Sequence, residues 1–399
     1  MEEGKNVDVI YLDYAKAFDK LDFTLTLKKL QKLGIRGKVY SWIKAFLSGR
    51  HQTVHVKGTK SDPEPVISGV PQGSVVGPLL FLVLIGDIDE RVSEAFVSSF
   101  ADDTRVMGHI TKPEDVDRLQ KDLDEIYEWS QENNTQLNAD KFECLRYGYD
   151  KVIKNSTIYK ASDGMDIEVK DKVKDLGVLM CSDATFDEQI SSVAIAANLK
   201  CGWVLRTFQT REKKLMLTLW KSLVQPVLDY CCQLWSPTQV GKINVLEQVQ
   251  ASFFKKINGM GQLAYWQQLE ALNTYSLQRR RERYVVIYVW KVLENLAPNF
   301  GIIAVNNRRH GRYCSVPHIK TAAPVRVQNL RFGSLCVNGP RLFNSLTSTV
   351  RNMTDCSVNS FKNALDRHLK TVPDEPRVKN LVSYCSKSSN SLLIMSPTN

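Results

Sequence analysis

Three aspartates stand where a metal-dependent reaction could use them. Asp13 follows the β-rich apolar segment 7–12, and Asp102 and Asp103 lie in a tight turn between two strand-like segments. Mg²⁺ prefers carboxylate oxygens and usually takes one or two from the protein, with substrate phosphates as further ligands. Nucleotidyl transfer requires two such ions about 4 Å apart, one at the attacking 3′-hydroxyl and one at the leaving pyrophosphate. Carboxylates at adjacent strand ends therefore predict a two-metal site.

The position of the pair Asp102-Asp103 distinguishes it from other acidic pairs in the chain. Asp89-Glu90 and Asp374-Glu375 are typical of solvated helix or loop charges. Aspartate is costly within a strand and favourable in a turn, so a pair between two apolar strands belongs to a hairpin turn. We therefore expect the pair to be held at a rigid sheet edge.

A Gly- and Pro-rich loop lies between the two groups of carboxylates. Residues 69–81 contain glycines at positions 69, 73 and 77 and lead into an apolar helix. These glycines allow close backbone approach or positive φ, and the helix start could face a phosphate. The alternative is a simple connection without a role in binding.

The elements that must position these residues change in type near residue 182. Before it, the apolar periodicity predicts an α/β unit, with helices over 25–33, 39–47, 78–91 and 113–133 and strands over 7–12, 52–56, 95–100, 104–109, 142–147, 157–159 and 176–180. After it, the pattern is helical, with helices predicted over 190–208, 213–230, 240–257, 277–296, 341–346 and 357–369. The Ser-rich tail after Pro373 is predicted to be disordered.

The charge of the chain is divided unevenly. Residues 1–200 have a net charge of −7, whereas residues 201–399 carry 27 basic and 10 acidic side chains, a net charge of +17. Such a basic half indicates a polyanionic partner, although a surface that serves solubility alone is the alternative. Within it, Arg279-Arg280-Arg281 and Arg283 lie on a predicted helix, and both RNA contact and a solvated helix start remain open.

The cysteine pattern and the hydropathy of the sequence indicate in which cellular compartment the protein is found. Nine Cys residues occur without CxxC pairs or zinc-ligand spacing, which is typical of reduced thiols in a cytoplasmic or nuclear protein. The N-terminal residues form no secretory signal, and the most apolar stretch, 77–88, is too short to cross a bilayer. We expect no membrane association, and no feature of the sequence indicates an oligomeric state.

Taken together, the motifs resemble those of a known enzyme family. The segments 11–19, 71–74 and 100–103 are similar, in order and spacing, to three palm motifs of reverse transcriptases. The likeness is greatest to non-LTR (LINE) retrotransposons of the jockey-like group. It continues through 137–141 and 176–178 into 218–230 and 275–281, and covers about residues 6–300.

The resemblance implies an RNA-directed DNA polymerase that adds dNTPs to a DNA primer on an RNA template. Asp13 and Asp102 would bind two Mg²⁺ ions, with Mn²⁺ as a possible substitute, and Asp103 would support them. Lys141 would lie near the pyrophosphate as a proton donor, unless it is a plain surface lysine.

The resemblance also implies roles for residues around the nucleotide. Phe18 would be the gate whose ring clashes with a ribose 2′-hydroxyl, unless it is a simple core residue. Gln72 and Gly73 would touch the templating base pair and the nucleotide. Leu176, Gly177 and Val178 would grip the primer end.

The implied fold class is α+β. We expect a right-hand polymerase palm (1–182), with an antiparallel sheet and packed helices, followed by a helical thumb (183–300), a basic C-terminal region (301–372) and a disordered tail (373–399). Twelve residues precede Asp13, so we expect a partial element without fingers or endonuclease, which extends a primer poorly by itself. A catalytically inactive remnant that binds RNA or DNA is the alternative, and an RNA-directed RNA polymerase is disfavoured by Phe18.

Overall fold

The chain forms two compact units. The computed structural model describes residues 6–148, 157–299, 301, 303–308, 311–320, 324–376 and 390–395. Its internal contacts divide the chain into a first unit of residues 1–177 and 181–184 and a second unit of residues 178–180 and 185–399. Within the described ranges, no helix is both long and apolar enough to span a lipid bilayer.

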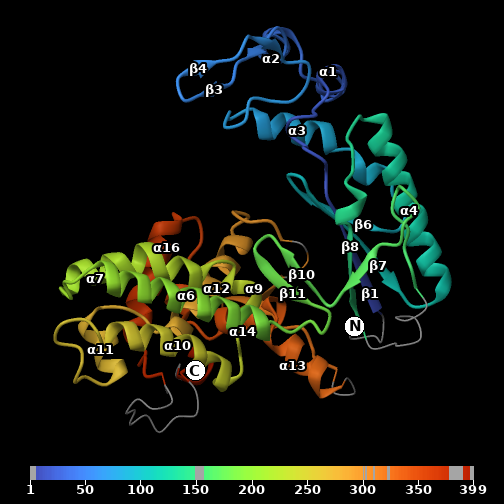
Figure 1. The fold of residues 1–399 in the computed structure, drawn as a ribbon. Coiled ribbons are helices and arrows are strands. Elements are labelled where there is room, and N and C mark those ends of the chain that lie inside the picture. The colour runs from blue at the N-terminus through green and yellow to red at the C-terminus, as the bar shows by residue number, and fades with distance from the viewer. Residues whose placement is uncertain are drawn as a thin grey trace. The chain divides into compact units, whose positions relative to one another are not determined.

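The first unit is built on a five-stranded sheet with the order β6-β7-β1-β8-β9 (Figure 1). The central strand β1 pairs antiparallel with both β7 and β8, and the β8–β9 pair is parallel. This mainly antiparallel sheet with packed helices confirms the predicted α+β palm. The strands are β1 (Asn6–Leu12), β6 (Phe96–Phe100), β7 (Asp103–Ile110), β8 (Glu143–Tyr147) and β9 (Glu168–Lys170).

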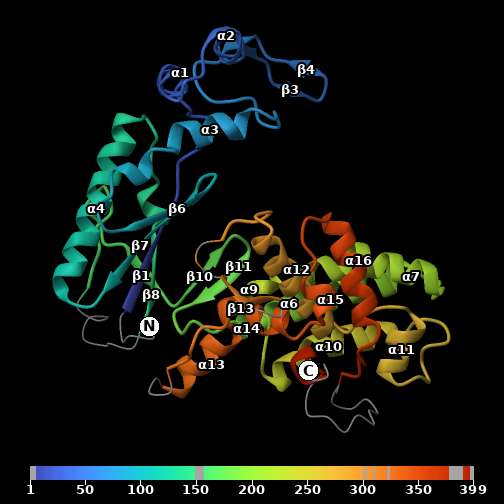
Figure 2. The ribbon, with the colours of Figure 1, turned by 180° about the vertical axis from the view of Figure 1, so that it is seen from behind.

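Helix α4 (Pro113–Glu132) lies along the sheet beside β7 in both views (Figures 1 and 2). The missing side chain of Gly108 permits this approach, because a Cβ there would lie 2.9 Å from Leu119 Cδ2. The other elements of the unit are α1 (Phe23–Lys32), α2 (Gly37–Leu47), α3 (Gly77–Ile85), η1 (Ile88–Glu90), η2 (Ala139–Lys141), β2 (His51–Gln52), β3 (His55–Val56), β4 (Thr59–Lys60), β5 (Glu64–Pro65) and β10 (Lys172–Asp175).

The second unit is mainly helical, and its two apolar clusters meet at α12 (Leu277–Leu293). The regions 183–300 and 301–372, expected as separate parts, therefore lie in one compact unit. Its other elements are β11 (Val178–Cys181), α6 (Asp187–Thr207), α7 (Lys213–Leu219), η3 (Trp220–Val224), α8 (Gln225–Asp229), α9 (Cys232–Trp235), α10 (Val240–Phe254), α11 (Tyr265–Ala271), β12 (Ala304–Arg308), β13 (Gly311–Ser315), α13 (Val325–Gly333), α14 (Leu335–Asn344), α15 (Ser348–Arg351), α16 (Val358–Leu369) and α17 (Leu392–Met395).

The buried carboxylate of Asp122 on α4 fixes the entry into β6. It accepts hydrogen bonds from the backbone N–H groups of Ser93 (2.9 Å), Glu94 (3.0 Å) and Ala95 (2.7 Å), and from the Ser93 hydroxyl (2.9 Å). Burial alone would raise the pKa of Asp122, but these bonds outweigh it and hold the pKa below its ordinary value. The ionised carboxylate therefore anchors the strand that leads to Asp102.

We predict that Asp122→Asn lowers the free energy of unfolding by about 1–3 kcal/mol, because the amide NH₂ would face backbone donors. In the wild-type chain, the contribution of the Asp122 carboxylate to the free energy of unfolding is fully present above the unfolded Asp pKa of about 3.9. It is lost as the pH falls through the lowered pKa of the folded state. Urea denaturation between pH 7 and pH 3 measures both effects. Asp124→Asn on the exposed side of α4 is the control and should change little. Equal stability of the two variants at pH 7 would contradict the anchoring role.

Candidate active site

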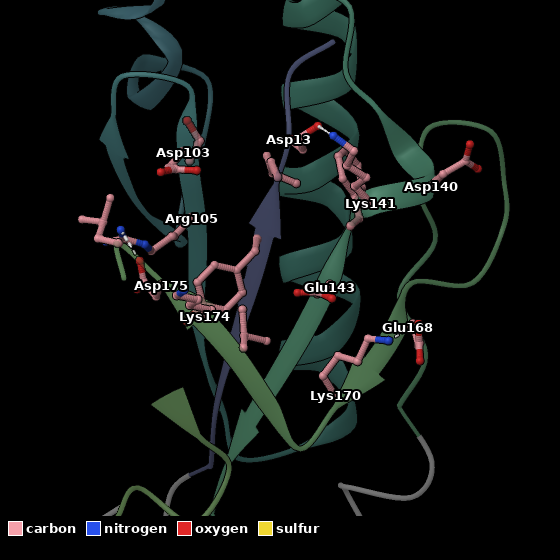
Figure 3. A pocket seen from close by; sticks show the side chains of 16 residues that line it. Asp13, Asp103, Arg105, Asp140, Lys141, Glu143, Glu168, Lys170, Lys174 and Asp175 are labelled. Atoms are coloured by element: carbon pink, nitrogen blue, oxygen red, sulfur yellow. Dashed lines mark hydrogen bonds and ion pairs between the residues drawn. The ribbon is translucent and has the colours of Figure 1, made fainter. Parts of the chain in front are cut away.

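The register of β1 against β7 brings Asp13 and Asp103 opposite each other. Leu12 pairs with Thr104, and the residues one step further along this register are Asp13 and Asp103. Directly opposed residues have Cβ atoms about 4.5–5.5 Å apart and point to the same face. Figure 3 shows both aspartates at the same end of the two strands.

Asp102 lies in the two-residue turn between β6 and β7. Phe100 pairs with Asp103, so Ala101 and Asp102 form the turn, and Asp103 is the first residue of β7 rather than part of the turn. Ala101 has φ 51°, a left-handed conformation that is uncommon for a residue with a side chain. The turn therefore holds Asp102 next to the opposed pair.

Burial and neighbouring carboxylates together raise the pKa of Asp103. Partial burial raises the pKa of Asp103 above its ordinary value; the charges of Asp102 and Asp13 raise it further, and Arg105 opposes them. The charges of both other predicted metal ligands, Asp13 and Asp102, therefore act on Asp103. Carboxylate oxygens that repel one another are a donor set that fits a divalent cation.

Lys141 lies beside the first aspartate. Its Nζ is 3.0 Å from Asp13 Oδ2, and Asn138 Nδ2 is 3.4 Å from the same oxygen. The backbone N–H of Asn138 also donates to the Asp13 carbonyl at 2.8 Å, which fixes this segment to the end of β1. In the described part of the chain, no three His, Cys, Asp or Glu side chains are arranged to enclose a metal ion. Lys141 instead pairs with the Asp13 carboxylate.

Asp13, Asp103 and Lys141 line an open pocket of about 400 Å³ (Figure 3). On its opposite side, Arg105 forms an ion pair with Asp175 at 2.5 Å. Both side chains are largely buried. Sequence reasoning missed this pair, because neither residue stands in a recognisable motif.

The predicted primer-binding residues do not form the strand expected over 176–180. Leu176 and Gly177 form a turn with φ values of 44° and 82°, and only Leu176 of the three lines the pocket of about 400 Å³. Val178 begins β11 and is buried in the core of the second unit. The sequence predicts a single strand here because Gly177 does not interrupt the apolar run, but a glycine readily adopts the positive φ of a turn.

The loop with Gln72 is fixed to the segment after Asp13. Gln72 Nε2 donates to Asp19 Oδ1 at 2.8 Å, and the Val70 N–H donates to the Phe18 carbonyl at 2.9 Å. Gly69 has φ 78°, and a Cβ there would lie 2.5 Å from the Asp19 carbonyl oxygen, so no side chain fits. The glycine thus permits the loop to lie against residues 18–21.

Gln72 lines a second pocket of about 780 Å³, together with Lys16, Asp19 and Arg50. Arg50 was not predicted; its Nη2 donates to the Gly69 carbonyl at 2.5 Å and its Nε to the Leu47 carbonyl at 2.9 Å. Gly73 is exposed, with φ 81° and open space around its Cα.

The Phe18 side chain is half-buried against helix α3. Its ring centroid lies 4.9 Å from that of Phe81, which is itself buried in the core of the first unit. A ring supported in this way cannot easily move aside. The position of Phe18 is therefore compatible with both interpretations, as a core residue and as a gate against a ribose 2′-hydroxyl.

Comparison with known proteins agrees with this geometry. Residues 1–180 match the family model described as "Reverse transcriptase (RNA-dependent DNA polymerase)". Residues 1–180 are a reverse transcriptase domain. The relatives that the chain resembles include RNA-directed DNA polymerases of jockey-like non-LTR retrotransposons, the group that the sequence motifs predicted.

The relatives are much longer than this chain. It is 26% identical over 270 residues to the RNA-directed DNA polymerase from mobile element jockey of Drosophila funebris, covering 65% of this chain and 29% of that protein. The Drosophila melanogaster jockey protein is 27% identical over 275 residues, with the same coverage. A telomerase from Candida albicans superposes with a TM-score of 0.36 and 11% identity, over 68% of this chain and 51% of its own. The chain thus spans about 29% of the jockey proteins' length.

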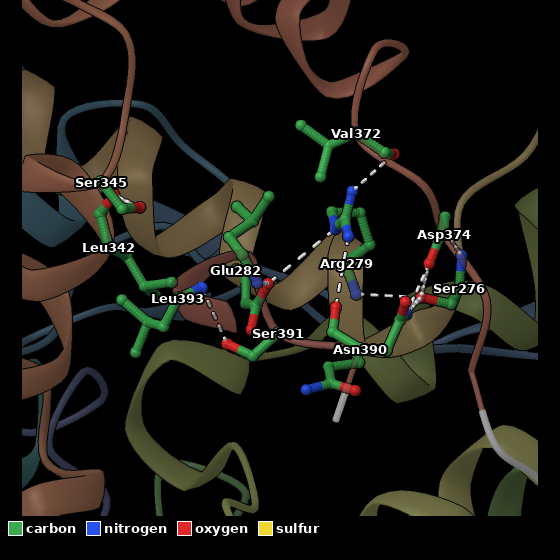
Figure 4. Close-up of polar contacts among 12 residues, drawn as sticks. Ser276, Arg279, Glu282, Leu342, Ser345, Val372, Asp374, Asn390, Ser391 and Leu393 are labelled. Atoms are coloured by element: carbon green, nitrogen blue, oxygen red, sulfur yellow. Dashed lines mark hydrogen bonds and ion pairs between the residues drawn. The ribbon is translucent and has the colours of Figure 1, made fainter. Parts of the chain in front are cut away.

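The four arginines at the start of α12, outside the reverse transcriptase domain, are structural. Arg279 is fully buried and donates to the carbonyls of Val372 (3.2 Å), Pro373 (3.0 Å) and Asn390 (3.2 Å) (Figure 4). Arg283 forms two hydrogen bonds with Asp366, at 2.6 and 2.7 Å. Arg281 is also buried, and Arg280 pairs with Asp229 at 2.8 Å.

Both interpretations of this basic cluster are therefore wrong. The arginines neither face solvent freely nor present a nucleic-acid surface, because Arg279, Arg280 and Arg283 bind carbonyls and carboxylates of their own unit and Arg281 is buried. The residues that bind these arginines also contradict the expected disorder of the tail after residue 373. This correction applies to the part of the tail that the structure describes. Asn390 and Leu392 are buried, and Asp374 accepts hydrogen bonds from the backbone N–H and the hydroxyl of Ser276. Residues 377–389 and 396–399 of that tail lie outside the described residues.

We predict that Asp103→Asn stabilises the metal-free protein at neutral pH. A carboxyl with a raised pKa favours folding fully only below the unfolded pKa, and that contribution is lost as the pH rises through the folded pKa. Removing the charge should therefore raise the melting temperature at pH 7 and leave it unchanged near pH 3. Thermal melting at both pH values in EDTA tests this, with Asp124→Asn as the control. A lower melting temperature at pH 7 would refute the repulsion.

We predict that Arg279→Met destabilises the second unit by about 3 kcal/mol, because it leaves buried carbonyls and the nearby Glu282 carboxylate without their partner. Urea denaturation monitored by tryptophan fluorescence would measure the loss. Arg206→Met, which replaces an exposed arginine of α6, is the matched control and should stay within about 0.5 kcal/mol of wild type. Similar small effects of both substitutions would show that Arg279 is not a structural anchor.

Proposed function

We propose that this chain is the catalytic part of an RNA-directed DNA polymerase of a non-LTR retrotransposon. The primer 3′-oxygen would attack the α-phosphorus of a dNTP, forming a phosphodiester bond as the bond to pyrophosphate breaks. The single observation that carries the proposal is that Asp13, directly after β1, meets Asp103 at the start of β7, with Asp102 in the adjoining turn. It occurs within a reverse transcriptase domain.

Asp13 and Asp102 would hold two Mg²⁺ ions, or Mn²⁺ in their place, and Asp103 would support them. Such ions activate the attacking hydroxyl and stabilise the leaving group when they are bound. The raised pKa of Asp103 supports this assignment, since the carboxylates repel one another without a cation.

Lys141 would protonate the leaving pyrophosphate. Its side chain is 64% exposed and its Nζ lies 3.0 Å from Asp13, so the ammonium is next to the proposed metal ligand and free to turn toward a phosphate. A positioned donor of this kind lowers the barrier by supplying the proton as charge develops on the leaving oxygen.

The remaining predicted residues would bind the substrates. Phe18, supported by Phe81, would exclude a ribose 2′-hydroxyl and so favour dNTPs. Gln72, oriented by Asp19, and Gly73 would contact the nucleotide and its base pair. Leu176, which lines the pocket, would grip the primer end together with Gly177 and Val178.

A remnant that binds nucleic acid without catalysis is the second candidate. The observation that favours it is the ion pair of Lys141 with Asp13, which occupies an oxygen that a metal ion would require. The net charge of +17 on residues 201–399 fits either function.

The two candidates differ in primer extension by the full chain on an RNA template. We predict that extension in Mg²⁺ or Mn²⁺ falls by about 10² to 10³ or more in Asp13→Asn and in Asp102→Asn, since each removes a strong electrostatic contact at the reacting phosphate. Incorporation of labelled dNTPs into a primer gives the rate, and Asp124→Asn should match wild type.

Undiminished extension by Asp102→Asn would exclude the assigned metal site. If wild type binds RNA but extends no primer in either metal ion, the non-catalytic function is the correct one.

A further inference from the structure

In the part of the chain that the structure describes, Arg341 on α14 has no anionic partner. No carboxylate in the described ranges pairs with it, and its Nη1 is buried without a hydrogen-bond acceptor. Its guanidinium lies over the ring of Phe332, with Cζ 4.2 Å from the ring centroid. Burial alone lowers the pKa of Arg341, because no nearby carboxylate offsets it. A guanidinium in this state gains free energy from any anion that reaches it.

Several other arginines of the unit have acceptors for their guanidinium groups. Arg312 pairs with Glu294, and Arg351 binds the carbonyls of Asn344 and Leu346. Arg279, Arg280 and Arg283 of α12 bind acceptors within the unit. Arg281 is buried there, and its Nη1 and Nη2 also lack an acceptor among the described residues, whereas Arg341 is only half-buried. Arg341 is therefore positioned differently from these structural arginines.

An exposed aromatic ring lies against Arg341. Phe332 on α13 remains 42% exposed although Arg341 covers part of its ring, and Val325, seven residues earlier on the same helix face, is 72% exposed. Residues 301–350 contain seven basic side chains and no acidic one. We call Val325, Phe332 and Arg341 the α13–α14 face.

The core of the second unit holds α14 rigidly. A Cβ at Gly339 would lie 3.0 Å from Val289 Cγ2, so the missing side chain lets α14 approach α12. The neighbouring Leu342 and Phe343 are fully buried. Arg341 therefore projects from a fixed helix, and its cost of immobilisation on binding a ligand is small.

An exposed aromatic ring next to a cation is the arrangement with which proteins bind unpaired nucleotides. The base stacks on the ring and the cation contacts the phosphate. A duplex offers its phosphates but not its base faces, so the exposed ring favours a single strand.

We propose that the α13–α14 face binds single-stranded nucleic acid, with one base stacked on Phe332 and an adjacent phosphate bound by Arg341. This site lies outside the reverse transcriptase domain. Its function is to hold a strand, and it does not depend on whether the aspartates catalyse primer extension.

Fluorescence anisotropy of the full chain with a labelled 16-nucleotide RNA tests the proposal. Phe332→Ala should weaken binding about 5-fold or more, from the loss of one stacked base. Arg341→Gln should weaken binding and reduce the slope of log K against log salt by about 0.7, the value for one phosphate contact on a single strand.

The controls separate this site from general charge and from folding. Arg367→Gln removes one positive charge from an exposed position of α16. In this background, Phe332→Ala should weaken RNA binding by the same factor as in the wild-type chain. Phe332→Trp should restore binding. Because Phe332 is exposed, its variants should melt at the wild-type temperature, so they test the site even if Arg341→Gln unfolds.

Three results would overturn the proposal: unchanged RNA affinity in Phe332→Ala, an equal loss with a 16-base-pair duplex, or displacement of RNA by poly-glutamate at equal charge concentration. The last would identify the face as a site for an acidic polypeptide. A single-stranded DNA of the same sequence distinguishes the two sugars. If the wild-type chain binds RNA but extends no primer, the proposed catalysis is refuted, whereas the proposed binding site on the α13–α14 face is not.

Discussion

The pairing of β1 with β7 is the constraint on which the site depends. Ile10 and Val106 are directly opposed in that register, and both are completely buried. A slip by one residue would turn them out of the core and carry Asp13 to the wrong face. The apolar pair therefore positions the carboxylates, although it lies three residues away from them and has no part in their chemistry.

The same register brings the negatively charged aspartates together, and nearby cations compensate their charge. Lys141 and Arg105 stand on either side of the aspartates, one paired with Asp13 and the other with Asp175. Each cation comes from a different element, which ties the strand ends to the segments that follow them. The result is a polar edge that is held together by charge and a sheet centre that is held together by burial.

The site residues could be predicted because short-range patterns determine them. Alternating apolar residues specify each strand, and Asp102 specifies a turn, so the strand ends that carry the aspartates follow from local sequence. Their opposition depends in addition on the long-range pairing of β1 with β7. The role of Arg279 could not be predicted, because its acceptors are carbonyls about a hundred residues later in the chain. The helices α13 and α14 were largely missed, since Gly333, Gly339 and Pro340 indicate a loop, whereas tertiary packing on α12 supports a helix.

The burial of Arg279 also sets an order of events during synthesis. Helix α12 emerges from the ribosome well before Asn390, whose carbonyl completes the ring of acceptors around that arginine. Until then the guanidinium must stay hydrated, so the apolar residues of α12 cannot close fully around it. The second unit therefore completes its folding late, because α12 packs fully only after the last contacts have formed. Nascent chains that stop short of residue 390 are candidates for chaperone capture and degradation.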